Sequence, residues 1–441
     1  MRWRNCGRIV FVPLTLITLG SAWGQGGPSV AGDWFATGDV YGTTVYFRLT
    51  FAQQGKHVST RLFGQTADGE LNDGHLHLVA KNPNGDITEM TAEVTGGWIK
   101  GTEVQTDASG REKPSVSRFT AQRVPKRPDA PPARHEFMPT MFYRQYSSLN
   151  PPALRVNPGD TIHTTAVDAS GVDENGVHRV RGGNPETGPF YVESALPGDT
   201  LVVHIVRLRL NRNYAGTDDS IVESALNSSL AVRTRDNGKA VRWHLDIEKG
   251  VATPIDPEPA LAHFAVPLRP MLGCIATAVG PAQAPPNAGD SGPYGGNMDF
   301  NEITEGATVY LPVANPGGLL YLGDGHALMG DGEINGNALE TSMDVEFTVD
   351  VVPGKRLGFV RVETPTHIIS MGLEGNLDDA LRSATNNMAQ WLAEDYNLNP
   401  SEIAQVIGTA AEYKVSEVAD RNSGVVLKLR KELLLQLKTA K

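Results

Sequence analysis

Short alternating runs of apolar and polar residues fill the chain from residue 28 to residue 124. Segments such as TTVYFRLTFAQQ and GHLHLVAKN repeat with a period of two and are separated by Gly, Asn and Asp. Successive side chains of a strand point to opposite faces, so this period is typical of half-buried strands. We therefore predict a small antiparallel β domain at residues 28–124, either a lipocalin-like barrel or a sandwich.

Four prolines follow this domain in the segment PKRPDAPP. Proline lacks a backbone donor and favours extended geometry, so residues 125–133 are predicted to be a linker. Strand-like runs resume after it, with turn signals such as NPGD at 157–160 and PGD at 197–199. These patterns predict a second, larger domain at residues 134–441 with layered β structure.

Helical spacing of apolar residues is found near the C-terminus. The segment LDDALRSATNNMAQWLAEDY predicts a helix capped by Asn376, and SEIAQVIGTAAEY predicts another capped by Ser401. The final segment VVLKLRKELLLQLKTAK predicts a strand followed by a helix. The predicted fold class is therefore mainly β with a C-terminal α part, preceded by the small antiparallel β domain.

The first 24 residues have the pattern of a secretory signal peptide. Arg2, Arg4 and Arg8 accompany an apolar run at residues 9–19, and Ala22 and Gly24 form a small-residue cleavage site. This run is shorter than the roughly 20 residues of a bilayer-spanning helix, and no later run reaches that length. We expect a periplasmic or secreted protein without a membrane span.

Cysteine content and charge narrow the picture further. Loss of the leader removes Cys6 and leaves Cys274, which cannot form an internal disulfide and is expected to be a small buried residue. The net charge is −11, and the leader holds three arginines without an acid, so the exported chain is more acidic still. A nucleic-acid partner is not expected.

One glycine-rich segment, GGLLYLGDGHALMGDGEINGNALE at 317–340, concentrates acids around a histidine. In extended backbone, Asp324 would face the same side as His326, and Asp331 the same side as Glu333. Imidazole and carboxylate are common ligands of zinc-like ions, and a further carboxylate can serve as a general base. The segment is compatible with metal-assisted hydrolysis, but also with two ordinary Asp-Gly turns.

The same segment resembles a known family. Its core GDGHALMGDGE is similar to the signature Gly-Asp-x-His-Ala-x-x-Gly-Asp-Gly-Glu of the acetamidase/formamidase family. Similar segments lie around it in the family's order, including NPGDTIHTTAVDASG, NPETGPFYVESALPGDTLVVHI and YGGNMDFNEITEGATVYLPV. The resemblance covers roughly residues 135–434. Tyr294 stands where a His is common, and Thr165 where an acid is common.

The resemblance implies a β-rich fold that hydrolyses small amides or lactams, with a divalent metal in some members. The metal ligands it implies here are Asp168, His326 and one of Asp324 or Glu333, of which Asp324 is preferred. The implied catalytic residues are Glu333 as general base, Asn297 as oxyanion donor, and Asp331. The implied substrate-binding residues are Asp299 and Arg269. The function expected is hydrolysis of a small linear amide with release of ammonia, using water activated by a metal such as zinc.

A different class of function stays open at this stage. The chain could be a secreted β-domain binding protein in which the acidic segment holds calcium or a sugar and catalysis has been lost. If the chain is an enzyme, we expect one pocket to contain Asp168, Asp324, His326 and Glu333. The sequence identifies neither the amide, nor the metal, nor the role of the N-terminal domain, nor whether copies of the chain associate.

Overall fold

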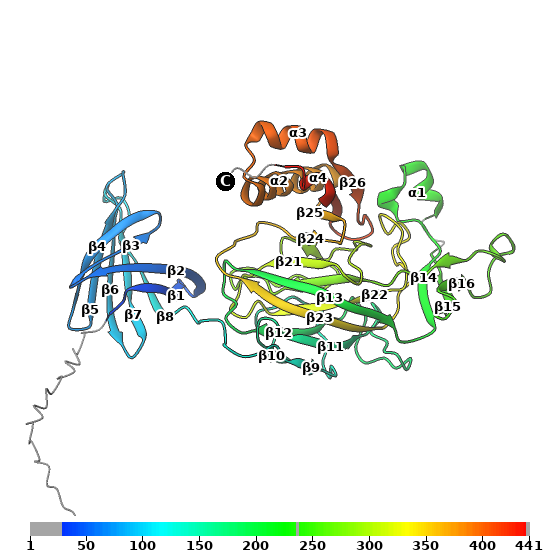
Figure 1. Cartoon of the computed structure of the whole chain (residues 1–441), viewed down its shortest axis with the longest axis horizontal. Coiled ribbons are helices and arrows are strands. Elements are labelled where there is room, and N and C mark those ends of the chain that lie inside the picture. The colour runs from blue at the N-terminus through cyan, green and yellow to red at the C-terminus, as the bar shows by residue number, and fades with distance from the viewer. Residues whose placement is uncertain (1–28, 235–237, 438–441) are drawn as a thin grey trace, which may run out of the picture. The chain divides into compact units, whose positions relative to one another are not determined.

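The computed structural model describes residues 29–234 and 238–437, so the predicted leader lies outside the described residues. Of these residues, 29–34 and 49–122 form one compact unit, and the others form a second. Strands predominate and most of the helical residues lie near the C-terminus (Figure 1), which confirms the predicted fold class. In the described part, no helix combines the length and the apolar character that a bilayer crossing needs.

The N-terminal strands close into a barrel in chain order. The strands are β1 (Gly32–Val40), β2 (Thr43–Gln54), β3 (His57–Leu62), β4 (Gln65–Asn72), β5 (His75–Lys81), β6 (Ile87–Thr95), β7 (Trp98–Thr106) and β8 (Ser115–Arg123). Burial alternates along them, most regularly in β5, where Leu76, Leu78 and Ala80 point inward. The alternation read from the sequence therefore belongs to a barrel with an apolar interior rather than to a sandwich.

The second unit contains three sheets. The six-stranded sheet runs in the order β10 (Leu154–Val156), β12 (Thr187–Val192), β22 (Leu320–His326), β18 (Met271–Thr277), β20 (Gly295–Asn297), β19 (Ser291–Gly292). The nine-stranded sheet runs in the order β26 (Glu412–Val415), β27 (Ser423–Arg430), β25 (His367–Glu374), β24 (Arg361–Glu363), β21 (Thr308–Pro312), β13 (Thr200–Leu210), β23 (Met343–Val352), β11 (Thr161–Ala166), β9 (Arg134–Glu136). The four-stranded sheet contains β14 (Tyr214–Asp218), β15 (Ala240–Asp246), β16 (Val251–Pro254) and β17 (Val266–Pro267).

One apolar core joins the two larger sheets. Leu272 and Leu322 of the six-stranded sheet share it with Val345 and Ile369 of the nine-stranded sheet, and all four are fully buried. Side chains from the facing surfaces of two sheets interdigitate in this way in a sandwich. Strands β18 and β22 are buried at every residue, so polar side chains placed on them are held away from water.

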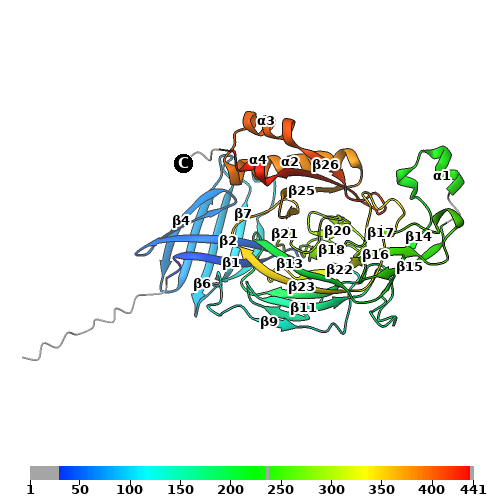
Figure 2. The same cartoon turned by 45° about the vertical axis from the view of Figure 1, so that its right-hand side comes forward.

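The helices cover one side of the nine-stranded sheet. Helix α2 (Leu377–Tyr396) packs on β25 and β27, and α3 (Pro400–Ala410) packs against α2 (Figure 2). Short helices elsewhere are α1 (Ser228–Thr234), α4 (Lys431–Leu434), η1 (Glu223–Ala225) and η2 (Pro259–Leu261).

The structure confirms one of the two predicted helix caps and corrects the other. Asn376 caps α2 as predicted, since its side chain accepts a hydrogen bond from the Asp379 N–H. The predicted cap Ser401 is wrong, because Asn399 caps α3 and forms a capping box with Glu402. The helix begins one residue before Ser401, at Pro400, whose fixed φ and missing N–H suit the first helical position. The predicted strand followed by a helix at the end of the chain is confirmed by β27 and α4.

Candidate metal centre and active site

The end of strand β22 carries the acids and the histidine of the glycine-rich segment into the protein interior. His326 is fully buried and lies opposite Met271 of β18. A short antiparallel bridge also joins His326 to Glu340, fourteen residues later in the chain. The intervening residues fold into turns around residues 331–335, so the prediction of extended backbone is wrong for Asp331 and Glu333.

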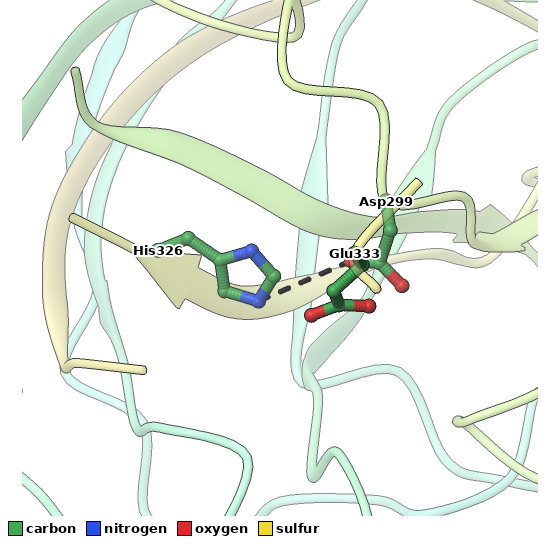
Figure 3. A group of neighbouring side chains, drawn as sticks. All are labelled: Asp299, His326 and Glu333. Atoms are coloured by element: carbon green, nitrogen blue, oxygen red, sulfur yellow. Dashed lines mark ion pairs between the residues drawn. The ribbon is translucent and has the colours of Figure 1, made fainter. Parts of the chain in front are cut away.

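His326 is the common member of two groups of buried ligand-type side chains. One group joins it to Asp299 and Glu333, and the other to Asp324 and Glu340, with the candidate atoms of each group within 4.8 Å of one another. His326 Nε2 lies 3.2 Å from Glu340 Oε1, 3.4 Å from Asp324 Oδ1 and 3.9 Å from Asp299 Oδ1. Figure 3 shows Asp299 and Glu333 close to one another, with His326 turned toward Asp299. Nitrogen and oxygen donors in this number suit a divalent cation.

Several atoms of this site are buried without a hydrogen bond from the protein. They include both oxygens of Asp299, Oδ1 of Asp324, Oε2 of Glu340 and both ring nitrogens of His326. Nearly all buried polar groups in folded proteins have a partner, and an unpaired buried charge is costly. In each of the two groups, one ligand atom from every residue lies within 4.8 Å of the others, which is the arrangement expected where a bound cation supplies the missing partner.

Backbone strain is concentrated at the same carboxylates. Asp299, Asp324 and Glu333 have φ angles of 39°, 56° and 43°. This left-handed region costs a residue with a side chain on the order of 1–3 kcal/mol, and such strain gathers at functional sites because it is retained only where it is needed. The three residues therefore hold their side chains in the site against a local preference for another conformation.

Burial and mutual repulsion shift the pKa values of these groups. Burial, assisted by Glu333 and Asp324, raises the pKa of Asp299 well above its usual range. Burial likewise raises the pKa of Glu333 to about 7 and raises that of Glu340 well above its usual range. Burial lowers the pKa of His326, but the Glu340 and Asp324 carboxylates outweigh it and raise the pKa well above normal. The site thus holds more acidic groups than His326 alone can balance, and a bound cation would offset their repulsion.

Gly273 of β18 makes room for two of the carboxylates. A Cβ atom at this position would lie 2.3 Å from Asp324 Oδ2 and 2.4 Å from Asp299 Oδ1. Real Cβ atoms do not approach oxygen so closely, so any other residue here would push the carboxylates away. The site therefore requires glycine at position 273, because a side chain there would displace the Asp299 and Asp324 carboxylates.

Asn297, predicted as an oxyanion donor, is buried beside this centre. Its Oδ1 accepts hydrogen bonds from Asn184 Nδ2 at 2.9 Å and from Cys274 Sγ at 2.8 Å. Its Nδ2 donates to Asp420. Because a side-chain amide nitrogen carries two hydrogens, Asn297 keeps one donor for a further acceptor.

Asp331 and Arg269, predicted as catalytic and substrate-binding residues, lie toward the surface. The Asp331 side chain is 59% exposed and forms an ion pair with Lys414 at 2.9 Å. Burial raises the pKa of Asp331, but hydrogen bonds from Lys414 and Asn301 outweigh burial and lower the pKa. The charge of Arg269, which is exposed, adds to this lowering. The structure therefore gives Asp331 protein partners, whereas Glu333 on the same turn points into the buried group.

Asp168, predicted as a metal ligand, belongs to neither buried group. Its carboxylate pairs with Arg212 Nη2 at 2.6 Å and accepts hydrogen bonds from the backbone N–H groups of Ser170 and Val172. Arg212 also donates to the Glu340 carbonyl, so Asp168 supports the backbone beside the centre. Asp324, His326 and Glu333 meet as the enzyme prediction requires, and Asp168 does not join them.

Two carboxylates of the centre and its surroundings were not singled out from the sequence. Glu340 ends the glycine-rich segment and reaches His326 through the bridge between their backbones. Glu186 lies in the segment NPETGPF, is fully buried, and has no hydrogen-bond partner for either oxygen. Burial raises the pKa of Glu186, which lies near the Cys274 thiol, well above normal. The available signal was an acid inside a quoted family segment for Glu186 and an acid at the end of the glycine-rich segment for Glu340.

Comparison with known proteins agrees with this site. The sequence model described as the Acetamidase/Formamidase family matches residues 282–412, which include Asn297, Asp299 and the whole glycine-rich segment. No curated protein sequence matches the chain.

Three solved structures are similar over most of their length. An acetamidase from Yersinia enterocolitica is 25% identical, with a TM-score of 0.61 over 70% of this chain and 95% of its own. An acetamidase from Bacillus halodurans is 28% identical (TM-score 0.59, 69% of this chain, 99% of its own). A predicted acetamidase/formamidase from Thermoanaerobacter tengcongensis is 27% identical (TM-score 0.60, 70% of this chain, 99% of its own). This chain is an amidohydrolase that resembles the acetamidase/formamidase family in its signature segment and its fold.

Proposed function

We propose that this amidohydrolase cleaves the C–N bond of a small linear amide and releases ammonia, with water activated at the His326 centre. The observation that carries the proposal is the set of buried, mutually facing carboxylate and imidazole atoms that have no protein partner. This donor set fits a divalent cation such as zinc, because it is rich in oxygen and nitrogen and deficient in positive charge.

Asp324, His326 and Glu340 would hold the cation. His326 Nε2 lies 3.2 Å from a carboxylate oxygen of Glu340 and 3.4 Å from one of Asp324, closer than to Asp299. When bound, a divalent cation in such a site acts as a Lewis acid and lowers the pKa of water. Gly273 and the strained backbone at Asp324 keep the required space and orientation.

The remaining residues supply proton transfer and charge stabilisation. Glu333 is buried beside His326, and one of its oxygens is fixed by the Ala338 N–H at 3.0 Å. Its other oxygen can take a proton from the attacking water and pass it to the leaving nitrogen. The second N–H of Asn297 can donate to the oxygen on which negative charge develops. The C–O bond forms, the C–N bond breaks, and the products are a carboxylate and ammonium.

An ammonia-release assay over formamide, acetamide, a small lactam and a peptide amide tests this proposal. Metal-replete protein should release ammonia from a small amide, a chelator should remove the activity, and the peptide should not be cleaved. His326→Ala should be inactive, whereas the exposed His263→Ala is the matched control and should keep the activity. Bound metal without turnover of any amide would favour the alternative of a binding protein.

A further inference from the structure

A cavity lined by Asp420, the carboxylate that accepts a hydrogen bond from Asn297, is larger than the simplest amides require. It has a volume of about 620 Å³. Acetamide has four non-hydrogen atoms and occupies on the order of 100 Å³, if each atom takes about the space of one water molecule. Cavities of this size in proteins usually hold ligands much larger than acetamide. The cavity therefore has room for an acyl group that extends well beyond the amide.

Two contacts connect this cavity to the catalytic residues. Asp420 lines the cavity and accepts a hydrogen bond from Asn297 Nδ2. Gly183 also lines it, and the next residue, Asn184, donates to Asn297 at 2.9 Å and approaches Asp324 Oδ2 at 3.4 Å. An amide whose carbonyl meets Asn297 would thus extend its acyl group into the cavity.

Two arginines line the same cavity with guanidinium donors to spare. Among the described residues, the Arg144 side chain makes one hydrogen bond, a long one of 3.4 Å to the Gly182 carbonyl. The Arg421 side chain is 79% exposed and forms an ion pair with Asp290 through one nitrogen, Nη1, at 3.7 Å, too long for a hydrogen bond. The other lining acid, Asp420, is engaged by Asn297. The guanidinium fork matches a carboxylate, which it binds with two parallel hydrogen bonds.

We propose that this cavity is the acyl subsite and that the substrate is the monoamide of a dicarboxylic acid, whose free carboxylate is bound by Arg144 and Arg421. The proposal rests on the proposed amide hydrolysis and specifies its substrate class. Water attacks the amide carbon, the C–O bond forms as the C–N bond breaks, and the nitrogen leaves as ammonia. The far carboxylate is unchanged, so the product is a dicarboxylate and ammonium.

The test compares succinamate with butyramide, in which a methyl group replaces the far carboxylate. For the metal-replete full chain, kcat/KM should favour succinamate by about 10- to 100-fold, since a hydrogen bond to a charged group has about that effect on an equilibrium. Arg144→Gln and Arg421→Gln should each lower this ratio by about tenfold, mainly through KM. Arg382→Gln on helix α2, where the arginine side chain is 71% exposed, is the matched control and should leave the ratio unchanged.

Other outcomes overturn the proposal in distinguishable ways. A wild-type ratio near one, or arginine variants that reduce both substrates equally, would show that the arginines do not bind a carboxylate. If no amide is turned over, the proposed function fails, and calorimetric titration with succinamate then tests the subsite alone. Binding that weakens about tenfold in Arg144→Gln supports the subsite, and absence of binding to the wild type refutes it.

Discussion

Asp168 and Asp324 are both buried aspartates of the same unit, with side chains 9% and 2% exposed, yet their surroundings are opposite. The Asp168 carboxylate is paired with Arg212 and two backbone N–H groups. Asp324 Oδ1 has no hydrogen-bond partner and faces other acids across His326. Burial alone therefore does not separate a structural carboxylate from a ligand. The distinguishing feature is whether donors of the protein itself pair with the carboxylate.

The two surroundings have different energetic consequences. A buried ion pair is stable while complete, and breaking it leaves an isolated charge in a medium that solvates it poorly. The carboxylates around His326 are in that unfavourable state unless a cation is bound, and three of them also carry backbone strain. The Asp168 corner should therefore contribute to stability, whereas the His326 centre should reduce it in the metal-free protein.

The largest expected effect is on catalysis at Glu333. Glu333→Gln keeps the shape of the side chain but removes proton acceptance, so kcat should fall by roughly 10²- to 10⁴-fold with the metal retained. Steady-state kinetics and metal analysis on the same preparation measure both quantities. Asp331→Asn on the same turn is the control, because that carboxylate is exposed and paired with Lys414. Equal losses in the two variants would contradict the distinction drawn between them.

The next effect is on stability at Asp168. Asp168→Asn leaves the buried Arg212 without its counter-charge, and the free energy of unfolding should fall by about 3–5 kcal/mol. Metal content should be unchanged in the folded protein. Denaturant unfolding together with metal analysis would measure this, and a variant of wild-type stability that had lost its metal would return Asp168 to the ligand set.

Gly273→Ala tests the site without removing any of its groups. The new methyl group displaces the Asp299 and Asp324 carboxylates, and a shift of about 1 Å can reduce turnover by about 10²-fold. Stability should change little, because the obstructing atoms belong to side chains and not to the backbone. Gly358→Ala is the control, since its Cβ would have no neighbour within 4 Å. Full activity of Gly273→Ala would show that the carboxylates need not stay where they are.

The smallest expected effect is a gain in stability, whereas the change at Asp168 is expected to cause a loss. Asp324→Asn removes one negative charge from the crowded group and keeps a residue that tolerates left-handed backbone. In the presence of a chelator, its free energy of unfolding should rise by about 0.5–2 kcal/mol, a usual gain when a functional site is relieved. A chelated variant less stable than the chelated wild type would indicate that Asp324 has a structural partner.

The sequence predicted the parts of this molecule that depend on local pattern. Strand alternation identified the barrel domain, and apolar spacing with Asn376 identified α2. It did not predict that Asp168 pairs with Arg212, because the two residues are 44 positions apart and no local rule relates them. Glu340 was missed for the same reason, since it meets His326 only after the chain turns back around residues 331–335.

The most direct test of the account is the metal content of purified full-length protein, measured by inductively coupled plasma mass spectrometry. We predict about one divalent cation per chain in the wild type and in Asp168→Asn, and almost none in His326→Ala, with all three proteins folded by circular dichroism. If folded His326→Ala keeps the wild-type metal content, the buried carboxylates around His326 do not form the cation site, and the account is wrong.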